Sequence, residues 1–239
     1  MNKGKMGMTI AACALAGAMM IGGTFAYLTD TRTATNTFTV GNVKVELSEP
    51  DYPGNNDPVT KEQVPNQETA KNPQIKNTGA NDAVVFMKVT VPVRTVMPVA
   101  DDGTKGTAGP AEMYIFKQDT DSAAAHTNNF SKDWVELAGK EEGKDLSGKT
   151  RTYVFGYHTR ISAGETTDPL FDKVQLKNFL EAEIEASDVL NIEIEGYAIQ
   201  ADNIVSGDGT LSTDAELNEQ TLGTIYDTYV KQNASAGGQ

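Results

Sequence analysis

Short stretches of this chain alternate apolar and polar residues, and runs of Gly, Pro and Asn separate them. Residues 83–93 show the pattern best: Val85 and Met87 share one face, and Phe86 and Lys88 share the other. A period of two is typical of strands in antiparallel sheets, which have one buried and one wetter face. Strands are therefore expected at residues 37–47, 71–78, 83–93, 113–116, 134–137, 151–159, 170–176 and 190–200.

Two segments carry helical spacing instead, residues 177–186 and residues 214–232, where Asp214 can cap the first turn. Many short strands with few helices predict an all-β fold, an antiparallel jelly-roll-like β-sandwich with one or two peripheral helices. We expect the sandwich to span residues 37–203. Residues 204–239 are then a polar loop, a C-terminal helix and a frayed tail.

The first 26 residues have the pattern of a secretory signal peptide. Lys3 and Lys5 form a basic head, residues 6–21 are apolar, and Thr24 and Ala26 occupy the −3 and −1 positions. We therefore expect cleavage between Ala26 and Tyr27 and a secreted product whose residues 27–36 form a flexible, Thr-rich N-terminus. No second apolar stretch of about 18 residues follows, so no membrane span is expected after cleavage.

Cys13, the only cysteine, leaves an alternative open. Residues 10–13 resemble a lipobox, in which this cysteine would be lipidated and would become the first residue of the product. Few apolar residues separate Lys5 from Ile10, however, and cleavage at Cys13 would leave an apolar stretch on the product. The signal-peptide interpretation is preferred, and under it the mature protein contains no disulfide.

The net charge of the chain limits the classes of molecule that it is expected to bind. The net charge of the chain is −13, and removal of Lys3 and Lys5 makes it −15. So acidic a protein is not expected to bind nucleic acid or anionic lipid.

No catalytic or cofactor-binding residues are expected, because no recognised motif is present. The two histidines, His126 and His158, lack a Glu or a second His at the spacing of a zinc site. No Gly-x-Ser-x-Gly elbow, phosphate-binding loop or dinucleotide fingerprint occurs. Calcium is the more plausible ion, because acidic loops supply hard oxygen ligands. The weak candidates are Asp101, Asp102, Asp202, Asp208 and Asp214, and none of them follows the EF-hand spacing.

Three blocks of sequence resemble the TasA/camelysin family: residues 22–30, residues 36–43, and the Asn-Thr-Gly-Ala-Asn-Asp-Ala run at 77–83. Residues 190–203 are similar to the last core strand of that family. Together the blocks cover about a third of the chain. The resemblance implies a jelly-roll sandwich, export through a SipW-type signal peptidase, and a place in the extracellular matrix.

Members of this family assemble into fibres in which the N-terminal segment of one subunit completes the sheet of its neighbour. The resemblance thus implies that the chain binds itself and other matrix proteins, with Tyr27, Leu28, Thr29 and Asp30 in the donor segment. An unpaired sheet edge is a physical template for such addition. Two alternatives stay open: a camelysin-like secreted metalloprotease, and a monomeric cell-surface binding module.

Overall fold

A computed structural model describes residues 42–55, 57–61, 63–119, 127–180, 184, 190–206, 209–211, 213, 214 and 216–234. These residues belong to one compact unit, Gly41–Gln239. No helix among them is long and apolar enough to cross a membrane.

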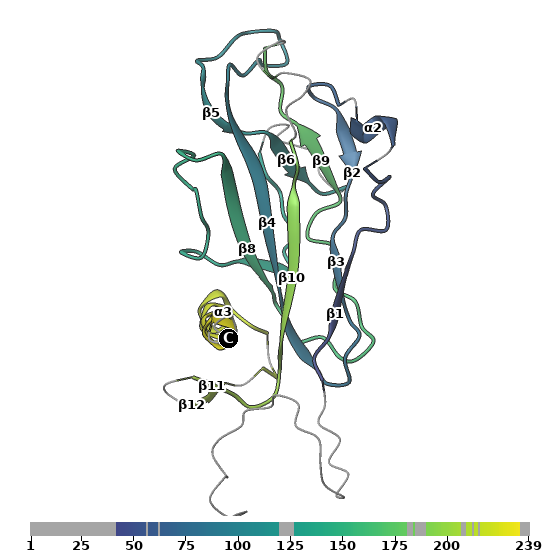
Figure 1. The fold of residues 1–239 in the computed structure, drawn as a ribbon, viewed down its shortest axis with the longest axis vertical. Helices are drawn as coiled ribbons and strands as arrows, with labels where there is room; N and C mark the ends of the chain where they lie inside the picture. The colour runs from purple at the N-terminus through teal and green to yellow at the C-terminus, as the bar shows by residue number, and fades with distance from the viewer. Residues whose placement is uncertain are drawn as a thin grey trace, which may run out of the picture. The chain divides into compact units, whose positions relative to one another are not determined.

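A five-stranded antiparallel sheet forms the first layer. Strands β10, β4, β8 and β7 lie side by side in that order, and β5 pairs with the last residues of β4 (Figure 1). Their bounds are β4 (Ala83–Val96), β5 (Gly109–Glu112), β7 (Trp134–Glu136), β8 (Thr150–Tyr157) and β10 (Glu193–Gln200).

Two smaller antiparallel sheets form the second layer, one in the order β2-β9-β6 and the other made of β1 and β3. Their bounds are β1 (Val45–Ser48), β2 (Glu68–Ala70), β3 (Gln74–Asn77), β6 (Tyr114–Lys117) and β9 (Lys173–Leu176). The connection from β1 to β2 contains a single helical turn, α2 (Pro58–Lys61). The main core lies between the layers, where Ile75, Phe116 and Val174 pack with Met87 and Phe155.

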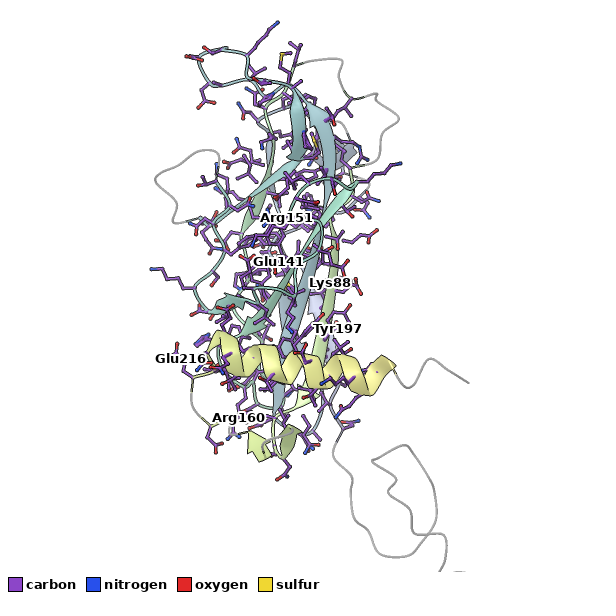
Figure 2. All side chains as sticks on the ribbon, turned by 90° about the vertical axis from the view of Figure 1, so that its left-hand side faces the viewer. Lys88, Glu141, Arg151, Arg160, Tyr197 and Glu216 are labelled. Carbon is purple, nitrogen blue, oxygen red and sulfur yellow. The ribbon has the colours of Figure 1, made fainter. Side chains whose placement is uncertain are left out.

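A second core covers the opposite face of the large sheet. There the C-terminal helix α3 (Glu219–Ala234) crosses the strands and places Leu222 and Ile225 against Phe86 and Val154 (Figure 2). All four side chains are buried. Strand β4 therefore has apolar residues on both faces as far as Phe86, and its outward face becomes polar from Lys88 onward.

These findings confirm the all-β antiparallel sandwich with peripheral helices that the alternation predicts. The C-terminal helix begins later than expected, because Asn218 caps it through a 2.9 Å hydrogen bond from the Thr221 amide to Oδ1. Asp214 instead lies 2.8 Å from Arg160 Nη1. Between the sandwich and α3, a small hairpin forms from β11 (Ile204–Ser206) and β12 (Gly209–Leu211) in a region expected to be loop.

The helix expected at residues 177–186 is wrong where the structure describes it. Residues 177–180 are not helical, since Phe179 forms a bridge with Pro98 and the Leu180 amide donates to the carbonyl of Met97. Phe179 is instead part of the main core, and Ile184 packs against it. Of the rest of the segment, only Ile184 is described, as a bend.

One ion-pair cluster joins the three strands of the β2-β9-β6 sheet. Lys117 Nζ lies 2.5 Å from Glu68 Oε1, and Lys173 Nζ lies 3.2 Å from Glu68 Oε2. The hydrogen bond from Lys117 is the largest of the effects that lower the pKa of Glu68 below its ordinary value of 4.5.

A carboxylate with a lowered pKa in the folded state stabilises the fold above its unfolded pKa, and this contribution is lost as the pH falls. We expect Glu68→Gln to lower the free energy of unfolding by about 0.5–1 kcal/mol at pH 7, because the pair is partly exposed. The difference from wild type should shrink as the pH falls below 4.5. Urea unfolding between pH 7 and pH 3 measures it, with Glu216→Gln as an exposed control. A pH-independent difference would contradict the assignment.

Candidate functional site at the open edge of β10

The described chain begins at Asn42, which runs against the turn between β3 and β4. The amides of Thr78 and Gly79 donate to the carbonyl of Lys44 at 2.8 and 3.0 Å, and the amide of Ala80 donates to the carbonyl of Asn42 at 3.0 Å. Three consecutive amides thus fasten the start of the described chain. We call this contact, residues 42–44 against residues 78–80, the clamp.

Gly79 makes the clamp possible because it leaves room for the passing backbone. A Cβ atom at this position would lie 2.4 Å from the Asn42 carbonyl oxygen and 2.8 Å from the Lys44 nitrogen. Both are backbone atoms, so no side-chain movement can relieve the overlap. The glycine of the Asn-Thr-Gly run is therefore required by a contact with residues more than thirty positions earlier.

Asn77 holds the same turn from inside. Its side chain is fully buried and donates from Nδ2 to the carbonyls of Asn81 at 2.8 Å and Ile161 at 3.1 Å, while Oδ1 accepts from the Gly79 amide at 3.0 Å. Two of the blocks that carry the family resemblance, residues 36–43 and 77–83, thus meet in space where they are described. Sequence reasoning singled out both blocks, but not their contact.

Strand β10 lies at one margin of the large sheet and, among the described residues, pairs only with β4. Its Ile194 and Ala198 point toward the main core, and its Tyr197 and Ile199 belong to the second core under α3. Over eight residues, one row of its main-chain donors and acceptors therefore faces away from β4. Such an edge can accept an added strand.

Aromatic side chains border the outer face of this edge. The Tyr197 and Tyr229 rings lie 5.4 Å apart, and the Phe86 and Tyr226 rings lie 5.3 Å apart in an edge-to-face arrangement. The Tyr197 hydroxyl donates to the Glu195 carboxylate. Burial first, and then this carboxylate, raise the pKa of Tyr197, so the hydroxyl keeps the proton that it donates to Glu195. Figure 2 shows Tyr197 and Lys88 on this face, beside α3.

A cavity of about 400 Å³ lies at the first residues of β10, between residues 190–193 and the segment that contains α2. Lys71 reaches it, with Nζ 2.7 Å from Glu49 Oε1 and 4.3 Å from the centre of the Tyr52 ring. The Tyr114 hydroxyl donates to Gln63 Oε1 at 2.7 Å. Burial raises the pKa of Tyr114 to about 12. The lining is largely polar, and within it Tyr52 bonds to Asn55 and Gln63 bonds to Thr69.

The structure does not gather the calcium candidates into one place. Asp101 and Asp102 lie in the loop between β4 and β5, at the opposite end of β4 from the β10–β11 connection (Figure 1). Asp102 accepts the Thr104 amide at 2.9 Å, and this bond is the main reason that its pKa is lowered. Asp202 and Asp214 meet at Arg160, with Oδ1 of each lying 3.4 and 2.8 Å from Nη1. Asp208 lies outside the described residues.

His158 does not fit a metal centre. Its Nδ1 lies 2.8 Å from the Asp133 carbonyl oxygen and 3.9 Å from the Asp133 carboxylate. In the part of the chain that the structure describes, no group of three or more His, Cys, Asp or Glu side chains could hold a metal ion. His126 is not among these residues. Cys13, the cleavage site at Ala26 and Tyr27, and the expected donor residues Tyr27, Leu28, Thr29 and Asp30 also lie outside them.

Comparisons with known proteins agree with the resemblance. Residues 1–106 match the family model described as camelysin metallo-endopeptidase, and this range contains the clamp and the whole of β4. No curated protein and no solved structure shows a significant match to the chain. Among the described residues, the donors around His158 do not form the metal site that the family description implies. Over residues 1–106, less than half of its length, the chain is therefore similar to the camelysin family.

Proposed function

We propose that this chain is a secreted structural protein of the extracellular matrix or cell surface, and that it self-assembles into fibres by strand addition. The observation that carries the proposal is the edge of β10, whose described pairing is with β4 alone. The donor is the N-terminal segment of a second copy, which begins at Tyr27 after cleavage by a signal peptidase of the SipW type. Other matrix proteins bind the same polymer.

Chain direction favours a donor from a second copy. The clamp fixes Asn42 beside Ala80, and Asn81 Nδ2 donates to Gln200 Oε1 at 3.2 Å, so the chain joins the sandwich near the last residue of β10. A segment of the same chain that lay along β10 and ended at Asn42 would run in the direction of β10. All described strand pairs are antiparallel. A second copy can supply its segment in that antiparallel sense.

Removal of residues 27–36 from the mature chain tests this proposal. We expect a folded monomer that forms no fibres, because the sandwich and the clamp begin beyond the deletion. Electron microscopy and sedimentation would be carried out at pH 7 and at pH 5. At the lower pH, protonation of carboxylates reduces repulsion between acidic subunits. The full mature chain is the control. Fibres from the truncated chain would overturn strand donation by this segment.

A peptidase is the second candidate, because the matched family is described as a metallo-endopeptidase. Casein digestion by the mature chain, with and without a chelator, separates the two functions. Cleavage that the chelator abolishes would favour the peptidase. Cleavage unaffected by the chelator would point to a contaminating protease of another class.

A further inference from the structure

We propose that the cavity at the first residues of β10 binds a sugar unit of a neutral polysaccharide. Its volume of about 400 Å³ falls within the range of sites for small ligands, roughly 300–1,000 Å³. The inference goes beyond the proposed function, because this site uses side chains rather than the main-chain edge of β10 and needs no second copy of the chain.

Both layers of the sandwich supply walls of this cavity. Thr69 on β2 and Val174 on β9 belong to the second layer, and Glu193 is the first residue of β10 in the large sheet. Apolar side chains ordinarily fill the space between two packed sheets. Here the lining includes Thr69 and Lys71, which are only 3 and 7% exposed. Burial of polar groups costs free energy unless they are hydrogen-bonded, so packing alone does not explain them.

One wall offers a hydrogen-bond donor to the cavity. The Tyr114 hydroxyl donates to Gln63 Oε1 at 2.7 Å, and Gln63 Nε2 donates to Thr69 Oγ1 at 3.0 Å. Thr69 Oγ1 accepts in this chain of bonds, so its own hydrogen is left over. That hydrogen finds no acceptor among the described residues. A buried O–H without an acceptor calls for an oxygen atom from outside the protein.

The first residues of β10 offer acceptors to the same cavity. Asn191 and Glu193 are exposed, and within the described part of the chain neither side chain has a hydrogen-bond or ion-pair partner. A carboxylate only accepts, whereas an amide both donates and accepts. A ligand that accepts from Thr69 and donates to Glu193 has the properties of a polyol, because each hydroxyl does both. Several hydroxyls on one small ring describe a sugar.

The charges of the lining favour a neutral sugar over an acidic one. Lys71, the cation in the lining, is held by Glu49, with Nζ 2.7 and 2.9 Å from the two carboxylate oxygens. Its charge is thus balanced within the protein, and Glu193 leaves the cavity negative. The chain as a whole has a net charge of −13, so it repels an anionic polymer.

Affinity electrophoresis of the full mature chain tests this site. The probes are dextran, soluble starch and galactomannan as neutral polysaccharides, and polygalacturonate as an anionic one. We expect at least one neutral polymer to retard the protein and polygalacturonate not to. Glu193→Gln should raise the dissociation constant about tenfold, because hydrogen bonds to a charged acceptor are the stronger ones. Glu46→Gln is the matched control, since it removes the same charge from an exposed strand residue outside the lining, and it should bind like wild type.

Thr69 gives a second readout. Thr69→Val removes the hydroxyl at nearly constant shape and should also raise the dissociation constant about tenfold, whereas Thr69→Ser keeps the hydroxyl and should bind like wild type. Retardation by none of the neutral polymers, or by polygalacturonate as strongly, would overturn the proposal. Binding that neither Glu193→Gln nor Thr69→Val weakens would overturn the cavity as the site. Fibre formation is scored separately, so either proposal can fail while the other stands.

Discussion

Replacement of Gly79 by alanine is expected to lower the free energy of unfolding by about 3 kcal/mol, the upper part of the usual range for overpacking. The new Cβ would lie 2.4 Å from the Asn42 carbonyl oxygen, so the backbone of residues 42–44 would have to move. That movement would weaken the amide bonds of the clamp and disturb the first residues of β1. Urea unfolding followed by Trp134 fluorescence measures the change.

Gly109→Ala is the control for this variant, because a Cβ at Gly109 meets nothing within 4 Å. It should change the free energy of unfolding by less than about 0.5 kcal/mol. If Gly79→Ala were equally neutral, the chain could not be held as tightly at Asn42 as the hydrogen bonds indicate. Hydrogen exchange of the Thr78, Gly79 and Ala80 amides reports on the clamp itself, and protection should fall in the variant.

Replacement of Phe86 by alanine is expected to have the largest effect, about 3–5 kcal/mol. Phe86 is fully buried and supports α3 through an edge-to-face contact with Tyr226 at 5.3 Å. The cavity that it leaves would lie between the sheet and the helix. We therefore expect the amides of α3 to lose protection from hydrogen exchange before those of β4.

Lys88→Ala supplies the comparison, because Lys88 is the next residue on the same face of β4. It is part-exposed and its Nζ lies 3.6 Å from Glu195 Oε1, so its loss should cost at most about 1 kcal/mol. Equal losses of unfolding free energy in the two variants would show that α3 contributes little to the stability of the sandwich. If Phe86→Ala greatly lowered the free energy of unfolding while the α3 amides stayed protected from exchange, contacts of Leu222 and Ile225 would be what holds the helix.

The strands with strict alternation could be predicted from sequence, because the alternation is a property of consecutive residues. In β4 the inward residues Val85 and Met87 and the outward Phe86 follow from a period of two alone. Pro92 could also be placed near an edge, and in the structure it comes after the last residue of β4 that β10 pairs. Helix positions were less predictable, because Phe179 fits a helical spacing but pairs with Pro98.

The site itself depends on contacts between distant residues, which sequence alone does not reveal. The sequence shows a glycine at position 79, but not that the backbone of Asn42 passes 2.4 Å from its missing Cβ. Asp214 has the residue type and position of a helix cap. Its carboxylate instead forms an ion pair with Arg160, more than fifty residues earlier. Asn218, which caps α3, carries an equally good signal, and the local sequence does not decide between the two.

The clamp also determines how a pull on the N-terminus would enter the molecule. Force applied to residues before Asn42 reaches the sandwich first through the amides of Thr78, Gly79 and Ala80 and then through the β1–β3 ladder. These bonds share the load over two neighbouring segments before any strand of the large sheet is strained. The clamp would thus act as the mechanical anchor of the N-terminal segment, and under the proposed self-assembly it would bear tension passed between subunits.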